Sequence, residues 1–355
     1  MTRYDVAFIG TGPEPENPVW GVSAAMAYQH APGYRDHGAC DIVACADLVP
    51  ENAGAFATEF GIDDDHVYED YEAMLREVEP DIVSISTPVP THAPIVLGCL
   101  RSGVLSAIHC EKPMATTWGD ARLIAQEADR RDVQLTFNHQ RRFAPHWREP
   151  KRLLDDGEIG ELERVEVATA ELLDNGTHYV DLANMYNDER LASWVIGQLD
   201  YREEHVKYGA HNTNQTTALW EYENGVHGLV ITGHGTDAVG CTVRLLGTDG
   251  EIQVNPPGEA SYRIRRAGDA DWEPVTHEGP DSVVAPAIEH LVDCLIEGSE
   301  PEISARRALS VTEIIFAVYE SSRRRGRVDM PLDVEDNPLE AMVESGELSP
   351  TPAED

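Results

Sequence analysis

The first 145 residues alternate short apolar runs with amphipathic stretches, and this alternation limits the fold more than any other feature of the chain. The apolar runs are rich in β-branched residues, as strands buried on both faces of a parallel sheet are. They cover residues 4–10, 41–47, 81–87, 106–112 and 133–138. The stretches between them have helical spacing and end at Gly or charged residues. This order predicts an α/β fold with a doubly wound parallel sheet, whose ligands bind at the carboxyl ends of the strands.

A different pattern begins after Pro150. Long alternating strands, with hairpin signals at residues 224–225 and 249–250, predict an open, mainly antiparallel sheet. Two helical segments follow at 284–298 and 304–323, and the end of the chain is acidic and rich in Pro. We therefore expect three parts, namely a parallel-sheet domain over 1–147, a second α/β domain over 148–332 and a mobile acidic tail over 333–355.

The charge balance excludes several kinds of partner. The 355 residues include 64 Asp and Glu but only 27 Lys and Arg, which gives a formal net charge of −37. Nucleic acids and anionic membrane surfaces would meet a repulsive field, and no apolar run approaches the ~20 residues of a membrane span. Only three of the bases are Lys. Such an acidic, Lys-poor composition resembles that of proteins from salt-accumulating halophiles, and an ordinary acidic protein is the alternative.

The Cys and His patterns bear on compartment and metals. The six Cys form no C-x-x-C pair and lie mostly in apolar stretches, which predicts free, buried thiols in a reducing cytoplasm. The amino terminus shows no basic region followed by a cleavage site, which also favours the cytoplasm. No His pair has the spacing of a zinc site, so no metal is expected.

A glycine-rich turn after the first strand points to a phosphate-binding loop. At Gly10, Thr11 and Gly12, glycines would let the backbone approach a pyrophosphate and pass it to a helix N-terminus. A plain turn after a strand is the alternative. The usual third Gly is absent, and residues 13–20 are interpreted as an insertion in this loop.

Asp47 ends the second strand, where a carboxylate can accept hydrogen bonds from an adenosine ribose. No Arg follows it to hold a 2′-phosphate, so NAD is favoured over NADP as the cofactor. A helix N-cap at Asp47 would suit either cofactor. The two features together predict that domain 1–147 is a dinucleotide-binding Rossmann domain.

Two further loops are expected at the same edge of the parallel sheet. Thr87, Pro88 and His92 follow the third strand, and Glu111 and Lys112 follow the fourth. Because the chain otherwise prefers Arg, a Lys in this position indicates a need for a compact ammonium with an adjustable pKa. His92 by itself would more often stabilise a turn.

One motif stands out in the second domain, at the expected start of its first buried helix. Asp174 and His178 are four residues apart, which places them about one helical turn from each other. Taken singly, Asp174 could be an N-cap and His178 a core histidine.

Together these motifs resemble the Gfo/Idh/MocA family of oxidoreductases, named after glucose-fructose oxidoreductase, inositol dehydrogenase and rhizopine catabolism proteins. The matching segments occur in the family's order over most of the chain. They are residues 10–12, 86–92, 111–113, 172–182 and 308–332. The resemblance implies an N-terminal Rossmann domain and a C-terminal α/β domain with a large open sheet. In the family this sheet commonly forms the oligomer interface, so a homodimer or homotetramer is expected.

The resemblance also implies roles for individual residues. Lys112 is similar to the family's catalytic lysine, Asp174 to its substrate-binding aspartate and His178 to its acid/base histidine. The positions expected at the cofactor are Gly10, Thr11, Gly12, Asp47, Thr87, Pro88, His92, Glu111 and Lys112. Those expected at the substrate are Lys112, Arg142, Asp174, Asn175 and His178. For Arg142, a salt-bridged surface position is the alternative.

These roles predict an NAD(P)-dependent oxidoreductase that transfers a hydride between a sugar or polyol hydroxyl carbon and the nicotinamide. His178 would act as general base, Lys112 would stabilise the hydroxyl oxygen as it becomes an alkoxide, and Asp174 would bind a neighbouring hydroxyl. A non-catalytic NAD(P)-sensing regulator and a redox-neutral, NAD-dependent sugar-modifying enzyme are the alternatives.

The chain departs from many relatives just before Asp174. The strand that precedes this motif runs into it almost directly, without the longer loop that covers the substrate in those relatives. The roof of the substrate site is therefore expected to be absent or to come from another segment. Tyr208 and His211 lie in a loop-like stretch that the sequence pattern does not place.

Overall fold

The computed structural model describes residues 3–13, 25–279 and 283–352. It contains two compact units, and neither is one continuous stretch of chain. The first comprises residues 1–116, 120–140 and 283–309, and the second comprises 117–119, 141–282 and 310–355. The expected division into consecutive blocks at residue 147 therefore differs from the structure, because residues 283–309 return to the first unit.

The described part of the first unit contains a six-stranded parallel sheet with the order β3-β2-β1-β4-β5-β6. Its strands are β1 Tyr4–Ile9, β2 Cys40–Ala46, β3 Val67–Tyr68, β4 Ile82–Ile85, β5 Ala107–Cys110 and β6 Gln134–Phe137. This order is that of the dinucleotide-binding doubly wound fold. The five strands predicted from the sequence are confirmed. The two-residue β3 was not predicted, because it is too short to show a pattern.

Helices cover this sheet. They are α1 Met26–Asp36, α2 Pro50–Phe60, α3 Tyr71–Val78, α4 His92–Ser102, α5 Trp118–Arg131 and α8 Val284–Glu297, with short turns of 3₁₀ helix at η2 Asp64–His66, η3 Val89–Thr91 and η4 Gln140–Phe143. Gly33 in α1 allows α8 to pack closely against this helix. A Cβ atom at Gly33 would lie 2.6 Å from the Cβ of Ile288 in α8, so the missing side chain lets the two helices approach closely.

The second unit contains a nine-stranded mixed sheet in its described residues, with the order β16-β15-β14-β13-β7-β12-β11-β8-β17. Its strands are β7 Leu162–Thr169, β8 Ala192–Asp200, β11 Gln215–Tyr222, β12 His227–Thr232, β13 Val243–Gly247, β14 Gly250–Val254, β15 Tyr262–Arg266, β16 Glu273–Val275 and β17 Val328–Asp329. Only the β7–β12 pair is parallel, so the predicted mainly antiparallel sheet is confirmed. The predicted hairpins appear as β11–β12 and β13–β14.

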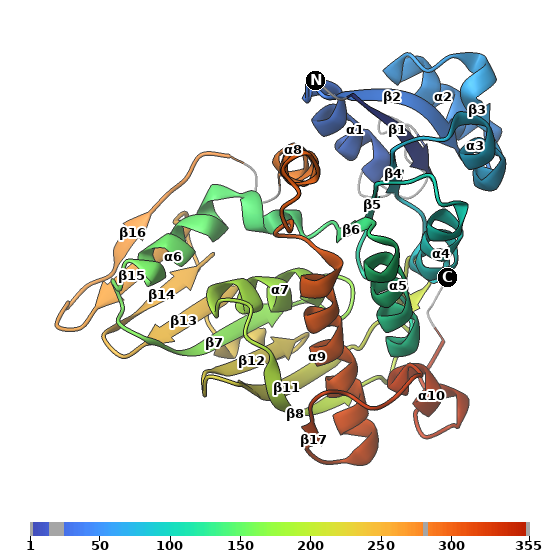
Figure 1. The fold of residues 1–355 in the computed structure, drawn as a ribbon. Helices are drawn as coiled ribbons and strands as arrows, with labels where there is room; N and C mark the ends of the chain where they lie inside the picture. Colours follow the sequence, from blue (N-terminus) through green and yellow to red (C-terminus); the bar gives the residue numbers. More distant parts are fainter. Residues whose placement is uncertain (1–2, 14–24, 280–282, 353–355) are drawn as a thin grey trace. The chain divides into compact units, whose positions relative to one another are not determined.

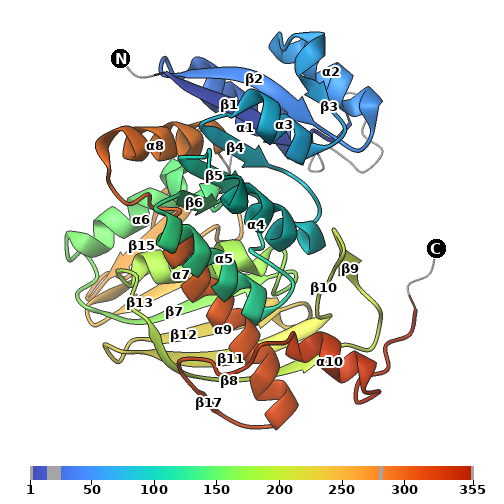
Figure 2. The ribbon, with the colours of Figure 1, turned by 45° about the vertical axis from the view of Figure 1, so that its right-hand side comes forward.

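Helices lie on one face of this sheet (Figures 1 and 2). They are α6 Pro145–Asp155, α7 Gly176–Tyr186 and α9 Ala305–Arg324, and α10 Pro338–Glu344 and the 3₁₀ turn η5 Thr236–Ala238 complete the helical segments. The inward-facing side chains Val167, Val195 and Trp220 are fully buried. A separate two-stranded hairpin, β9 Val206–Lys207 with β10 Ala210–His211, extends from this unit.

The acidic segment 333–352 contains the helix α10, which the prediction of a mobile tail did not include. Asn337 caps α10 by accepting hydrogen bonds from the backbone N–H groups of Leu339 and Glu340 at 3.0 and 3.4 Å. Leu339 and Met342 are buried, so the helix has an apolar face despite its acids. The charge of the segment concealed the sequence signals of a helix, namely an Asn N-cap followed by Pro.

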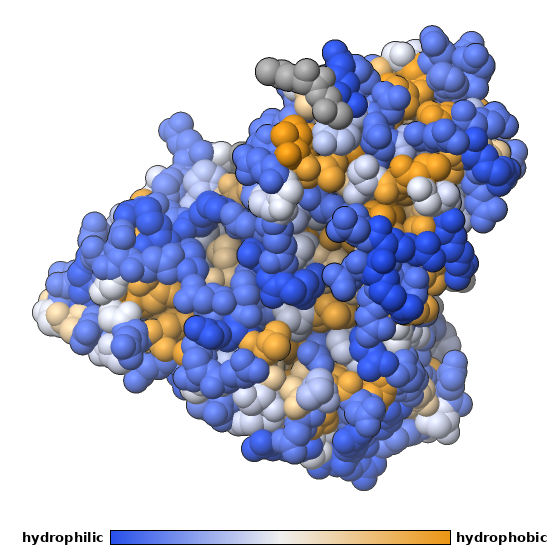
Figure 3. Space-filling view, in the orientation of Figure 1, coloured by the Kyte–Doolittle hydropathy of each residue, from blue (hydrophilic) through white to orange (hydrophobic). Residues whose placement is uncertain are grey.

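All six Cys are free and buried, as predicted. Within the residues described, no helix is both long and apolar enough to cross a membrane. Hydrophilic residues cover most of the face shown in Figure 3, and apolar residues form small separate patches on it. This pattern agrees with the strongly acidic composition.

Candidate functional site

The glycine loop of the first unit is bound to the end of β2. Gly10 and Gly12 have φ values of 78° and 66°, and a Cβ at Gly10 would lie 2.5 Å from Cγ2 of Thr87. The backbone N–H groups of Thr11 and Gly12 donate to Oδ2 of Asp47 at 2.8 and 3.0 Å. The structure thus brings the predicted phosphate loop and the predicted ribose-binding carboxylate together.

These residues fit a dinucleotide. Gly10 and Gly12 place no side chain in the loop after β1, and the backbone and hydroxyl of Thr11 hold the Asp47 carboxylate at the end of β2. Apart from Pro13, the predicted insertion at 13–20 lies outside the described residues.

His92 connects the two loops that the sequence places at the same sheet edge. Its Nδ1 lies 2.8 Å from the carbonyl oxygen of Pro113, and its Nε2 lies 2.8 Å from that of Thr87. The ring is completely buried, and this burial lowers its pKa. His92 therefore holds the loop after β4 against the loop after β5, which supports the reading of a turn-stabilising imidazole.

Glu111 lies in a buried polar network directly before Lys112. Its Oε1 accepts hydrogen bonds from Nε2 of His30 at 2.9 Å and from Nδ2 of Asn138 at 2.6 Å. Its Oε2 accepts one from the backbone N–H of Lys112 at 3.2 Å. Burial by itself raises the pKa of Glu111, but the hydrogen bond and charge of His30 and the charge of Lys112 lower it to about 2. Glu111 is thus a fixed carboxylate that positions the backbone of Lys112.

In the second unit, α7 positions the predicted acid/base motif. The backbone N–H of His178 donates to the carbonyl oxygen of Asn175 at 3.2 Å, so the helical turn includes Asn175 and begins just after Asp174. The backbone N–H of Asp174 donates to Oδ1 of Asn212 at 2.9 Å. Asp174 and His178 are both buried, with 8% and 5% exposure. Such enclosed groups have environments that can adjust their pKa values for proton transfer.

Arg142, predicted to contact substrate, lies in a buried ion pair. Its side chain is fully buried, and its guanidinium donates to both carboxylate oxygens of Asp181 at 2.6 Å and also pairs with Glu189. Burial by itself lowers the pKa of Arg142, but these two carboxylates raise it above its usual value. The alternative of a surface salt bridge is wrong, because the ion pair lies in the interior.

The adjacent Arg141 has a different environment. Its guanidinium lies over the ring of Tyr179, 4.4 Å from the centroid, and hydrogen-bonds the Tyr179 hydroxyl. Its Nη2 donates to Oδ1 of Asn175 at 3.1 Å. Among the described residues no carboxylate pairs with Arg141, so it places a partly buried cation at the start of α7.

Lys207 is not among the residues predicted from the sequence. It ends β9, and its Nζ lies 2.6 Å from Oε1 of Glu171 and 3.2 Å from Oδ2 of Asp174. Burial by itself lowers the pKa of Lys207, but the two carboxylates raise it above its usual value. The scarcity of Lys, which drew attention to Lys112, was the available signal for Lys207 as well. Tyr208 and His211, which the sequence did not place, lie in the same hairpin.

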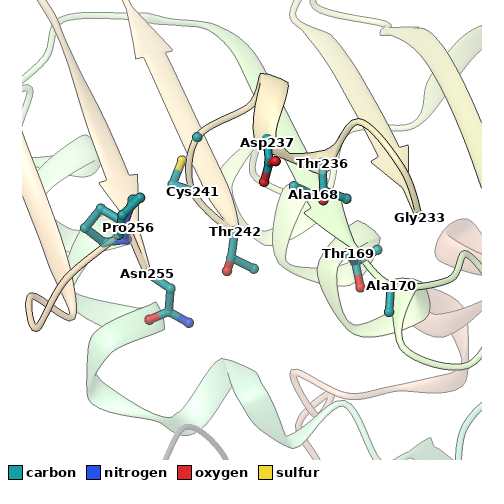
Figure 4. Close-up of a pocket in the computed structure, with 12 residues that line it drawn as sticks. Ala168, Thr169, Ala170, Gly233, Thr236, Asp237, Cys241, Thr242, Asn255 and Pro256 are labelled. Atoms are coloured by element: carbon teal, nitrogen blue, oxygen red, sulfur yellow. The ribbon is translucent and has the colours of Figure 1, made fainter.

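An open cavity of about 740 Å³ lies at the carboxyl ends of β7, β12 and β14 (Figure 4). Its polar lining residues are Thr169, Thr236, Asp237, Thr242 and Asn255. The chain leaves this cavity at Ala170 and continues directly into Glu171 and Asp174. Hydroxyl, amide and carboxylate groups of this kind are suited to hydrogen-bonding a polyhydroxylated ligand. In the described residues, no cluster of three His, Cys, Asp or Glu side chains could hold a metal ion.

Comparison with known proteins identifies the first unit. Residues 18–139 match the family model GFO_IDH_MocA, described as an oxidoreductase family with an NAD-binding Rossmann fold. Residues 18–139 are thus similar to this family of oxidoreductases.

Similar curated proteins extend the likeness over both units. It is 26% identical to D-apiose dehydrogenase of Paraburkholderia graminis, over 93% of this chain and 90% of that protein. It is 27% identical to inositol 2-dehydrogenase of Rubrobacter xylanophilus, over 74% of each chain.

Solved structures support the fold of this chain. The aldose-aldose oxidoreductase of Caulobacter crescentus superposes with a TM-score of 0.74 at 19% identity, over 92% of this chain and all of that chain. An oxidoreductase of Agrobacterium radiobacter, solved with NAD+ and L-tartaric acid, gives 0.73 at 21% identity over 92% of this chain and 98% of that one. These matches confirm the predicted combination of a Rossmann sheet with a mainly antiparallel sheet.

Proposed function

We propose that this protein is an NAD-dependent dehydrogenase that oxidises a secondary alcohol or hemiacetal carbon of a sugar or polyol. The names of its relatives, which include dehydrogenases of apiose and inositol, support this substrate class. The observation that carries the proposal is the buried pair of Asp174 and His178. Asp174 lies just before α7, and His178 lies in the first turn of that helix. The cavity lined by Thr, Asn and Asp residues directly precedes this motif in the chain and supports a polyhydroxylated substrate.

In the proposed reaction, His178 takes the proton of the substrate hydroxyl as general base, because an imidazole titrates near neutral pH. Lys112 donates a hydrogen bond to the same oxygen and stabilises the negative charge that develops on it. Asp174 accepts a hydrogen bond from a neighbouring hydroxyl and so orients the carbon that is oxidised. Bound NAD supplies the acceptor for the hydride.

The first unit supports a positioning role for Glu111 and His92. Glu111 holds the backbone of Lys112, and His92 holds the two loops together. We propose that Thr87 and Pro88 line the cofactor beside Gly10, since a Cβ at Gly10 would meet Thr87.

We propose NAD rather than NADP as the cofactor. The Asp47 carboxylate is fixed by the N–H groups of Thr11 and Gly12 and by the backbone N–H of Val49, which donates to Oδ1 at 2.9 Å. A carboxylate held there would repel a 2′-phosphate, while it can accept hydrogen bonds from ribose hydroxyls.

Arg141 and Asn175 are the further substrate contacts that we propose in place of Arg142. Arg141 carries a charge that no described carboxylate neutralises, and Asn175 presents its amide beside it. A guanidinium and an amide together can hydrogen-bond several oxygens of one sugar.

We propose that the protein assembles as a homodimer or homotetramer through the outer face of the nine-stranded sheet. The strand register places Ile196, Leu219 and Leu229 in one cross-strand row on that face. Ile196 is 44% exposed, whereas its neighbour Val195 is fully buried on the inner face. A second copy would cover this apolar row, so light scattering should give the mass of at least two chains.

The composition supports two proposals about the cell. We propose a halophilic adaptation, since the excess of 64 acids over 27 bases makes the chain repel itself, and high salt screens this repulsion. We also propose a cytoplasmic location, because all six thiols are free and buried.

The test measures NADH formation in molar KCl with myo-inositol, D-apiose and related polyols, using NAD and then NADP. We expect Lys112→Ala and His178→Ala each to lower kcat by about 10²–10⁴, the usual contribution of a positioned proton-transfer group. His227→Ala is the matched control, because the His227 side chain in β12 is 41% exposed. Undiminished turnover in either variant would contradict the assigned roles. Product without NADH would indicate the redox-neutral enzyme, and NAD binding without any product would indicate the regulator.

A further inference from the structure

The hairpin β9–β10 has a turn that fixes the position of Lys207. Lys207 pairs with Ala210, and the two residues between them, Tyr208 and Gly209, have φ values of 48° and 82°. Positive φ at both central residues is typical of the tight two-residue turn that matches the twist of a hairpin. Lys207 is therefore held by a short, defined hairpin.

A second bond fixes this hairpin relative to α7. Asn212, which directly follows β10, is fully buried and accepts the hydrogen bond of the Asp174 backbone at 2.9 Å. The side chain of Lys207 contacts the carboxylate of the same Asp174. Main chain and side chain of Asp174 are thus both bound to residues 207–212.

The charges around Lys207 leave it with binding capacity. The side chains of Glu171 and Asp174 are 4% and 11% exposed, whereas the side chain of Lys207 is 42% exposed. An ammonium has three N–H donors, and the two carboxylates use two of them. In the described part of the chain, no third acceptor contacts this nitrogen. The third donor is available to a ligand.

From this arrangement we infer that Lys207 is a substrate-binding residue and that it selects a vicinal diol. Its ammonium donates to one hydroxyl oxygen, and the adjacent Asp174 carboxylate accepts from the neighbouring hydroxyl. A donor and an acceptor 3.2 Å apart match two hydroxyl groups on adjacent carbons, since each hydroxyl can both donate and accept. The hairpin thereby supplies the roof that the short connection before Asp174 lacks. This inference rests on the proposed dehydrogenase function.

The experiment compares Lys207→Met with Lys151→Met in the NADH assay. Lys151 is the matched control, because it is also a partly buried Lys of the second unit, paired with Asp155 and Asp188 away from Asp174. Each variant is assayed with myo-inositol and with a monodeoxy inositol that lacks the neighbouring hydroxyl. We expect Lys207→Met to raise KM for myo-inositol roughly 10- to 100-fold, to change kcat much less and to remove most of the preference for the diol.

The outcomes separate the inference from the proposed function. An active wild type with equal KM values for Lys207→Met and Lys151→Met would overturn the role of Lys207 and leave the dehydrogenase standing. A wild type that binds NAD but oxidises no polyol would overturn both. NADH binding, followed by fluorescence, should be the same in all variants, because Lys207 belongs to the unit that lacks the Rossmann sheet.

A second measurement covers the case in which Lys207→Met does not fold. The chain has only three Lys, so ¹⁵N-lysine labelling gives few ammonium signals, and Lys207→Arg identifies that of Lys207. We expect myo-inositol, added to the NADH complex, to shift the Lys207 signal and to leave the Lys151 signal in place. An unchanged Lys207 signal at saturating myo-inositol would overturn the inference.

Discussion

The two units hold a buried carboxylate near a proposed catalytic residue in different ways. In the first unit, Glu111 precedes Lys112 and is held by His30 and Asn138. In the second unit, Asp181 follows His178 by one helical turn and is held by Arg142. The partners in the first unit are an imidazole and an amide, whereas the partner in the second is a guanidinium, which stays charged at any working pH.

This difference affects how each unit responds to pH. The loop with Lys112 depends on Glu111, whose pKa His30 and Lys112 lower against the effect of burial, so that acid removes its charge. The helix with His178 depends on an ion pair of constant charge. We therefore expect the contribution of Glu111 to the stability of the first unit to decrease as the pH falls.

The largest expected effect comes from breaking the pair in the second unit. Arg142→Met leaves Asp181 buried without its guanidinium and should lower the free energy of unfolding by about 3–5 kcal/mol, as for other broken buried ion pairs. Urea denaturation at neutral pH in molar KCl measures this loss.

The neighbouring arginine provides the control. Arg141→Met removes a partly buried guanidinium that no described carboxylate pairs with, so the expected loss is within about 1 kcal/mol. Equal losses in the two variants would show that the enclosed ion pair does not hold α7 in place. Should Arg142→Met fail to fold, Arg142→Lys keeps the charge but loses the bidentate geometry and should show an intermediate loss.

The contrast between these two arginines also shows where sequence reasoning ends. Their order in the chain does not reveal which side chain turns inward, because that depends on Asp181 and Glu189, which α7 and the following turn bring into place. Lys207 escaped prediction for the same reason, since its partners Glu171 and Asp174 lie more than 30 residues away along the chain.

Other features were predictable because their signals are local. The strands of the first unit are buried on both faces, so their apolar runs mark them directly. Gly10, Gly12 and Asp47 lie at strand ends, and the parallel order brings such ends together. The cap at Asn337 was equally local, but the strong acidity of the tail outweighed it in the prediction.

The second prediction tests the titration of Glu111 in the first unit. The pKa of Glu111 is lowered from 4.5 to about 2 in the folded chain, so its contribution to stability is present above the unfolded pKa and is lost as pH falls from about 5 toward 2. The full contribution is about 3 kcal/mol. Glu111→Gln removes the titration, so between pH 7 and pH 3 the wild type should lose about 2 kcal/mol more stability than the variant.

Urea denaturation at a series of pH values in constant KCl measures this difference. Arg141→Met serves as the comparison, because Arg141 pairs with no described carboxylate, so the variant should retain the wild-type slope over the pH range where Glu111 titrates. A Glu111→Gln variant with the same slope as the wild type would mean that the buried network does not depend on the charge of Glu111.

The smallest expected effect concerns salt, which should act on exposed charges and not on either buried partner. The net charge of −37 destabilises the compact state by self-repulsion, and screening at molar KCl removes most of it. We expect the melting temperature to rise by several degrees between low salt and molar KCl. Salt screens buried pairs much less than exposed charges. The salt-induced gain in the free energy of unfolding should therefore be the same in Glu111→Gln, Arg142→Met and the wild type, within about 0.5 kcal/mol. A smaller rise in only one variant would mean that the ion pair removed in that variant contributes to the salt dependence of stability. The two units would then differ in their response to salt as well as to pH.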